Sequence, residues 1–218
     1  MFRVMLYSQW KWSRLIVLLG SVAGFALPIL SVQGAARADS SPLQAPELLH
    51  AVQSWGALYP VLAATLGLLV AIASWTPDHR GRHVYALALP VPRWRYVLLR
   101  FGAGALLLFA PITAVLVGAL LATWSAAIPA GLQGYPVALA VRFTLAVLVA
   151  FAVFFAVSAG TARTAGIVLA LIGGVMLVQV IASVASVDLD LVGKLQPLVL
   201  NWPGPLAIFT GRWMLIDV

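Results

Sequence analysis

The residues that could carry chemistry are few in this chain, and their spacing does not form a catalytic or metal-binding set. His79 and His83 are four residues apart, which can place two imidazoles on one face of a helix. The third histidine, His50, belongs to a different predicted loop. Asp188 and Asp190 lie close together in the sequence, but their alternation with leucines is typical of a solvated loop. We therefore predict no metal site, no cofactor and no catalytic residue.

The sequence also lacks a nucleotide-binding motif. The pair Gly193-Lys194 has neither the earlier glycine nor the following Ser or Thr of a phosphate-binding loop. The chain contains no cysteine, which excludes disulfides, thiolate metal ligands and iron–sulfur clusters. If ATP hydrolysis drives this protein, another chain must bind the nucleotide.

Arg142 and Gln179 are polar residues inside predicted membrane spans, and both are candidate residues of a transport pathway. A charged residue within a span is a functional-site candidate. Arg142 lies near the outer start of its span, so its side chain can also extend to the membrane surface. Gln179 can instead form a hydrogen bond with a neighbouring helix.

The composition requires a membrane environment. Of the 218 residues, 63% are hydrophobic and 9% are charged, whereas a soluble domain carries about 25% charged residues. Because so few charges cannot cover a surface in water, we predict an all-α integral membrane protein with a single transmembrane domain over 1–218. The excess of 13 Lys and Arg over 6 Asp and Glu then reflects loop orientation and anionic lipid. We expect no nucleic acid partner.

Five apolar stretches are long enough to cross a bilayer core of about 30 Å as helices. They are residues 15–33, 51–75, 96–124, 137–160 and 164–187. Residues 1–14 are predicted to form an amphipathic helix on the inner membrane surface, and the alternative is a basic flank that only sets the topology. A cleaved signal peptide is disfavoured, because the first apolar stretch is longer than the roughly 7–15 residues of a signal sequence.

Residues 188–218 are predicted to form a broken element on the outer side of the membrane. Pro197, Pro203 and Pro205 interrupt an otherwise apolar stretch. Proline removes a helix donor and clashes with the preceding turn, so a straight helix is not expected there. The alternative is a distorted sixth span that returns the C-terminus to the inner side.

The distribution of basic residues predicts the orientation. With the N-terminus inside, nine of the 13 Lys and Arg residues fall in inner segments and four in outer segments. The inner residues are Arg3, Lys11, Arg14, Arg80, Arg82, Arg93, Arg95, Arg100 and Arg163, and the outer residues are Arg37, Arg142, Lys194 and Arg212. We predict a multi-pass protein of the bacterial cytoplasmic (inner) membrane with a cytoplasmic N-terminus.

The loop at residues 76–95 is the most unusual segment of the chain. A charged turn that contains Gly81 comes first, residues 84–89 are apolar but too short to span, and Pro90 and Pro92 end them. This pattern predicts a short helix along the inner surface, which a cytoplasmic partner can move as a rigid body. The positive-inside rule explains the arginines around the helix, but not the short apolar stretch itself.

This arrangement resembles the permease family of type-2 ABC exporters. In that family a basic amphipathic helix precedes the first span, and the loop after the second span holds a glycine-containing turn, an apolar helix and a Leu-Pro-x-x-Arg sequence. The corresponding residues here are Gly81, Leu89-Pro90 and Arg93. The resemblance implies that the loop is a coupling helix that seats in a groove of a nucleotide-binding subunit. The chain departs from the family in its missing or unrecognisable sixth span.

The resemblance therefore predicts a permease subunit of an ATP-driven exporter. Its expected partners are an ABC-type ATPase subunit, a second permease copy or homologue, and the lipid bilayer. The predicted partner-coupling residues are Val84, Tyr85, Leu87, Leu89 and Arg93. The alternative is a membrane anchor or scaffold subunit that transports nothing, and a membrane-embedded enzyme is disfavoured for want of a catalytic set.

Overall fold

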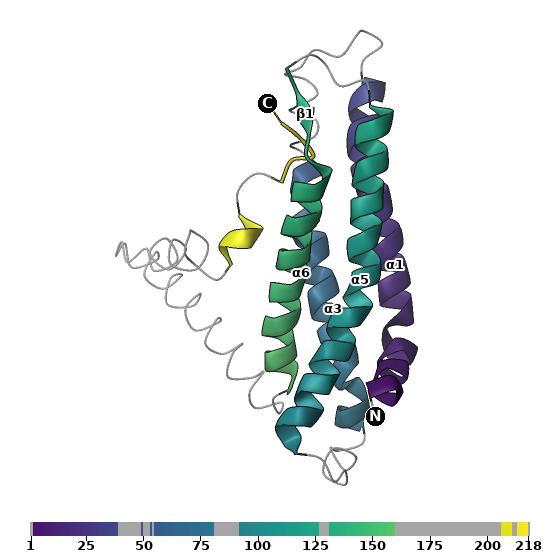
Figure 1. Ribbon diagram of the computed structural model, residues 1–218, viewed down its shortest axis with the longest axis vertical. Coiled ribbons are helices and arrows are strands. Elements are labelled where there is room, and N and C mark those ends of the chain that lie inside the picture. Colours follow the sequence, from purple (N-terminus) through teal and green to yellow (C-terminus); the bar gives the residue numbers. More distant parts are fainter. Residues whose placement is uncertain are drawn as a thin grey trace, which may run out of the picture. The chain divides into compact units, whose positions relative to one another are not determined.

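The computed structural model describes residues 2–38, 49, 53, 55–80, 92–126, 131–159, 206–210 and 213–217 (Figure 1). Its long helices are α1 (Phe2–Ala38), α3 (Leu58–Arg80), α5 (Arg93–Ser125) and α6 (Pro136–Ala159). These four helices are long and apolar enough to cross a membrane. The predicted fold class is confirmed at this level: the chain is a helical, multi-pass membrane protein.

The chain divides into two compact units. The first comprises Met1–Phe155 together with Arg212–Val218, and the second is Ala156–Gly211. Within the second unit, the structure describes the last turn of α6 and a short 3-10 helix, η1 (Ala207–Phe209). The predicted fifth span, 164–187, lies outside the described residues and stays a prediction.

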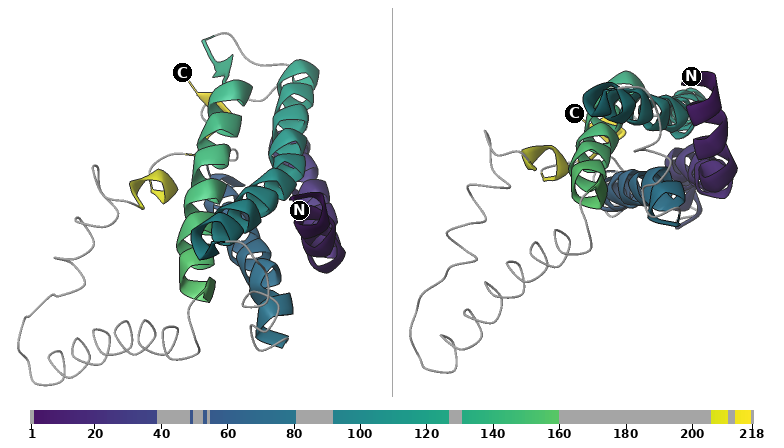
Figure 2. Two further views of the ribbon diagram at one scale, coloured as in Figure 1. Left: turned by 60° about the horizontal axis from the view of Figure 1, so that its bottom comes forward. Right: turned by 90° about the horizontal axis from the view of Figure 1, so that it is seen from below.

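Long helices that follow one another in the chain run in opposite directions, so the neighbours α1 and α5 are parallel (Figures 1 and 2). Gln9 of α1 contacts Arg100 of α5, and Arg100 contacts Asp78 near the end of α3. At the same end of the unit, Phe155 near the end of α6 contacts Trp75 of α3. This end therefore holds the starts of α1 and α5 and the ends of α3 and α6. We call it the basic end, after the described residues Arg3, Lys11, Arg14, Arg93 and Arg95.

Glycines allow the helices of the first unit to pack closely. A Cβ atom at Gly24 of α1 would lie 3.2 Å from the backbone oxygen of Pro111 in α5. A Cβ atom at Gly118 of α5 would collide with the backbone of Phe25 in α1. A Cβ atom at Gly20 would meet the side chain of Leu66 in α3, so both glycines of the Gly20-x-x-x-Gly24 sequence lie at helix contacts inside this chain.

Aromatic side chains fill the space between α3, α5 and α6 toward the basic end. The ring of Phe101 lies 5.1 Å from that of Phe151 and 5.4 Å from that of Phe155. The ring of Trp75 lies 5.0 Å from Phe155, and its indole N–H donates to the Phe155 carbonyl at 3.1 Å. These contacts bury large apolar surfaces and give the only polar group among them, the indole N–H, a partner.

The C-terminal residues close the opposite end of the first unit, which we call the strand end. Strand β2 (Ile216–Asp217) pairs antiparallel with β1 (Gln133–Gly134), with Gln133 opposite Asp217. Leu215 is fully buried, and its carbonyl accepts a hydrogen bond from the amide of Tyr135 at 2.8 Å. Of the predicted broken element 188–218, the described residues form this strand and η1.

The observed boundaries of the first two long helices differ from the predicted ones, and α3 begins at Leu58 rather than at residue 51. No break separates residues 1–14 from the first span, because α1 is one helix of 37 residues. At about 55 Å it is longer than a bilayer core of about 30 Å, so part of it must lie outside the core. The second helix continues past the predicted boundary at residue 75 as far as Arg80, with Pro77 inside it.

The predicted end of this span at residue 75, near the end of the charge-free stretch, is wrong, because the helix continues to Arg80. Proline lacks the N–H that the helix would use, which costs the turn one hydrogen bond. Contacts from α5 offset this loss. Asp78 forms an ion pair with Arg100 of α5, and the Nε of Arg100 donates to the carbonyl of Ser74. The last turn of the helix is therefore held from α5.

Candidate functional site

A buried ion pair joins α3 to α5 at the basic end of the first unit. The guanidinium of Arg100 donates to the carboxylate of Asp78, and their side chains are only 6% and 4% exposed. The hydroxyl of Tyr96 donates to the same carboxylate at 3.0 Å. Tyr96 and Arg100 are four residues apart on α5, so both reach Asp78 from one face of that helix.

The guanidinium of Arg100 has two further partners on α3. Its Nε donates to the carbonyl of Ser74 at 2.6 Å, and its centre lies 4.9 Å from the ring centre of Trp75. Ser74 and Asp78 are one turn apart, which places both acceptors along a single line on α3. The arginine is therefore fixed by an ion pair, a backbone acceptor and a cation–π contact.

The N-terminal helix is attached to the same cluster. The amide nitrogen of Gln9 donates to the backbone carbonyl of Arg100 at 2.9 Å, and both residues are buried. Ser13, one turn further along α1, donates to the carbonyl of Gln9 at 2.8 Å. We give the name basic-end cluster to Gln9, Ser74, Trp75, Asp78, Tyr96 and Arg100.

The buried charges of this cluster hold the helices together. Charges inside a membrane protein are costly, and those that persist face the bundle interior and pair with one another. Removing one partner of a buried ion pair typically costs about 3–5 kcal/mol, because an uncompensated charge remains. The pair of Asp78 and Arg100 therefore opposes any separation of α3 from α5 at this end.

Sequence reasoning missed Asp78 and Arg100 as site residues. Both were counted with the inner charges that set the topology, and Asp78 was assigned to a loop. One signal pointed to the pair: Arg100 lies one turn inside the predicted apolar span 96–124, where a lone charge needs a partner. Asp78 is the single acidic residue that the predicted topology places on that side.

The predicted coupling residues are described only in part. Arg93 lies on the first turn of α5 and is exposed. Val84, Tyr85, Leu87 and Leu89 lie outside the described residues, as does the pathway candidate Gln179. The described chain thus shows the two helix ends that flank residues 81–91, and both ends contribute to the basic-end cluster.

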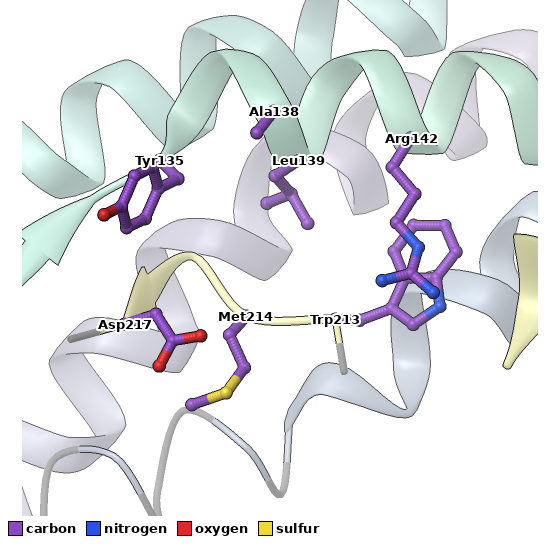
Figure 3. Close-up of a pocket in the computed structure, with 7 residues that line it drawn as sticks. All are labelled: Tyr135, Ala138, Leu139, Arg142, Trp213, Met214 and Asp217. Atoms are coloured by element: carbon purple, nitrogen blue, oxygen red, sulfur yellow. The ribbon is translucent and has the colours of Figure 1, made fainter. Parts of the chain in front are cut away.

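Arg142 lies at the strand end, far along the unit from the basic-end cluster. Its guanidinium carbon is 4.6 Å from the ring centre of Trp213, a residue that precedes β2. The Trp213 ring stacks on Tyr59 of α3, with 6.3 Å between ring centres. Figure 3 shows Arg142 and Trp213 beside a cavity of about 260 Å³. The cavity is lined by Tyr135, Ala138, Leu139, Arg142, Trp213, Met214 and Asp217.

Among the described residues, no three His, Cys, Asp or Glu side chains group as metal ligands would. Comparison of the chain with protein-family models, with curated proteins and with solved structures finds no match.

Proposed function

We propose that this chain is the permease subunit of an ATP-driven ABC-type exporter, coupled to a separate nucleotide-binding subunit. The observation that carries the proposal is the position of the buried ion pair. Asp78 lies two residues before the end of α3, and Arg100 lies seven residues after the start of α5. The pair therefore joins the helix ends on both sides of residues 81–91, which include the predicted coupling helix at 84–89.

A coupling element must pass a displacement to the helices rather than absorb it. Packed helices respond to a local push by moving as rigid bodies, because tightly packed interfaces do not deform continuously. With α3 and α5 joined through Asp78 and Arg100, a partner that displaces residues 81–91 moves both helices together. Without the pair, each helix end would yield separately.

The N-terminal helix offers a second route for the same displacement. Gln9 holds the backbone of Arg100 on α5, and α1 packs more extensively on α5 than any other described helix does. Arg3, Lys11 and Arg14 give the start of α1 the basic character of an inner membrane surface. In the proposed topology, the basic end faces the cytoplasm of a bacterial cell and meets the ATPase there.

Recovery of an ATPase with the purified chain tests this proposal. The chain is purified from native membranes, and the double variant Tyr85→Ala with Leu89→Ala is purified beside it at equal abundance. Truncating buried side chains at an interface typically costs about 1–3 kcal/mol each, so the variant should recover about tenfold less ATPase or lower still. The matched control, Trp124→Ala with Leu121→Ala, removes one aromatic and one leucine that are exposed at the strand end.

The control variant should recover as much ATPase as the wild type. Undiminished recovery from the Tyr85 and Leu89 variant would overturn the coupling assignment. Recovery of no ATPase by the wild type would overturn the permease proposal in favour of an anchor or scaffold subunit.

A further inference from the structure

The first turns of α1 carry basic and aromatic side chains along one exposed side of the helix. Residues at intervals of four, four and three share one side of a helix, and here they are Arg3, Tyr7, Lys11 and Arg14. Trp10 lies one turn before Arg14 on the same side. All five of these residues are exposed. We call this set of residues the α1 basic stripe.

The three cations of the stripe have no counterion in the described part of the chain. No side-chain ion pair or hydrogen bond joins Arg3, Lys11 or Arg14 to another described residue. Within the described ranges at the basic end, the one acidic side chain is Asp78, and it is buried in its pair with Arg100. Lys11 and Arg14 lie one turn apart, so their like charges repel each other. An anion from outside the chain would relieve this repulsion.

Another side of the same helical segment is held by the rest of the unit. Gln9 and Ser13 are buried, and Gln9 donates to the carbonyl of Arg100. The ring of Phe2 lies 3.9 Å from the Cβ position of Gly102, a residue beyond Arg100 on α5. In a straight pair of parallel helices, Phe2 would lie before Arg100, so the start of α1 turns across α5 (Figure 2). The basic stripe is therefore presented outward from a held helix at the basic end.

The side of α1 that carries the stripe continues as an apolar face. Leu15, Leu18 and Val22 follow Lys11 at intervals of four, three and four residues, and they are 66%, 53% and 66% exposed. They therefore lie on the same side of the helix as Lys11. Cations followed by exposed apolar side chains match the order of charge and hydrocarbon in a phospholipid. This order favours a lipid over a soluble anion, which has no apolar part to match.

We propose that Lys11 and Arg14 bind the head-group phosphate of an anionic phospholipid, with Arg3 adding positive charge. The acyl chains lie along Leu15 and Leu18. The two binding cations are three residues apart, about 4.5 Å along the helix axis, so both can reach one phosphate. The two aromatic rings of the stripe suit the level of the head groups. Phosphatidylglycerol has the required net negative charge, whereas phosphatidylethanolamine adds an ammonium that the stripe repels. The site is independent of the proposed transport function.

Native mass spectrometry of the full chain tests the proposal. The purified protein is presented in detergent with equal amounts of phosphatidylglycerol and phosphatidylethanolamine, and the lipid retained per chain is counted. The wild type should retain phosphatidylglycerol in preference. A basic side chain near an anionic head group changes the affinity by about a factor of five. Arg14→Gln should therefore lower the retention of phosphatidylglycerol about fivefold, and Lys11→Gln with Arg14→Gln should lower it about twentyfold.

Control variants separate the stripe from total charge and from folding. Arg95→Gln makes the same change at an exposed cation of α5 and should retain lipid as the wild type does. Arg14→Lys keeps the charge and should retain most of the preference for phosphatidylglycerol. Because Arg14 is exposed, Arg14→Gln and the wild type should unfold at the same temperature when no lipid is added. Free glycerol phosphate is added as a competitor in millimolar excess.

Several results would overturn the proposal. Two of them are equal retention of both lipids by the wild type and full retention of phosphatidylglycerol by the Lys11 and Arg14 double variant. An equal loss in Arg95→Gln and Arg14→Gln would show that total charge, rather than the stripe, attracts the lipid. Full displacement of the lipid by glycerol phosphate would assign the stripe to a soluble anion.

Discussion

Arg100 on α5 and Asp78 on α3 are separated by 22 residues and form an ion pair that is almost completely buried. Together with Gln9, it links three helices at the end of the unit where residues 81–91 connect α3 to α5. This ion pair determines how a displacement of residues 81–91 is passed on to α3 and α5.

Neutralising one member of the pair should destabilise the protein strongly. Asp78→Asn leaves the Arg100 cation buried without its counterion, and Arg100→Gln leaves the carboxylate; each should cost about 3–5 kcal/mol. The double variant Asp78→Asn with Arg100→Gln should be more stable than either single variant, because amides can hydrogen-bond without charge. Thermal unfolding in detergent measures all three.

The control for this series is Arg95→Gln on the exposed first turn of α5, which should change stability by about 0.5 kcal/mol or less. Equal stability of the wild type and both single variants would show that the pair does not hold α3 to α5. A double variant less stable than both single variants would contradict the charge argument.

Close packing of α1 on α5 should depend on Gly118. Its Cβ position collides with the backbone of Phe25, which cannot move aside as a flexible side chain can. Gly118→Ala should therefore separate the helices and cost about 1–3 kcal/mol, as overpacked cores do. Gly102→Ala on the same helix is the matched control, since its Cβ would have one neighbour, at 3.9 Å.

Gly102→Ala should be neutral or slightly stabilising, because alanine also favours the helix. The two variants are compared by thermal unfolding at the same detergent concentration. A Gly118→Ala protein as stable as the Gly102→Ala protein would contradict the packing of α1 against α5.

The basic end should face the cytoplasm. The chain has no native cysteine, so a single introduced thiol reports one position. Ser8→Cys lies near the start of α1 at the basic end, and Ser125→Cys lies at the exposed end of α5 on the opposite side. In intact cells, a membrane-impermeant maleimide should label Ser125→Cys and should label Ser8→Cys only after permeabilisation. The reverse pattern would invert the proposed topology.

The sequence predicts much of the described fold, because a bilayer imposes its thickness on every span. Apolar stretches at 96–124 and 137–160 agree with α5 and α6 within a few residues. The end of α3 was misplaced because the charge-free stretch ends before Asp78, a charge that the sequence alone assigns to a loop. Only the contact with α5, through Asp78, shows why the helix continues.

The two charged sites were less predictable than the helices. The partners of Arg100 and Arg142 come from distant parts of the chain, Asp78 and Trp213, and a single sequence carries no record of such contacts. Periodicity assigns residues to a helix but does not say which helix packs on it. The pairing of β2 with β1 could not be predicted either, because it joins residues that are far apart in the sequence.

The central claim is that the pair of Asp78 and Arg100 transmits nucleotide-driven motion from the basic end to the strand end. The direct measurement is the distance between spin labels at Ser125→Cys and Val137→Cys, at the strand ends of α5 and α6, in the complex with the ATPase. Both positions are exposed. We predict that a non-hydrolysable ATP analogue shifts this distance in the otherwise wild-type chain. The double variant Asp78→Leu with Arg100→Leu, whose side chains cannot hydrogen-bond to each other, should still bind the ATPase and lose the shift, and the same shift in that variant would contradict the claim.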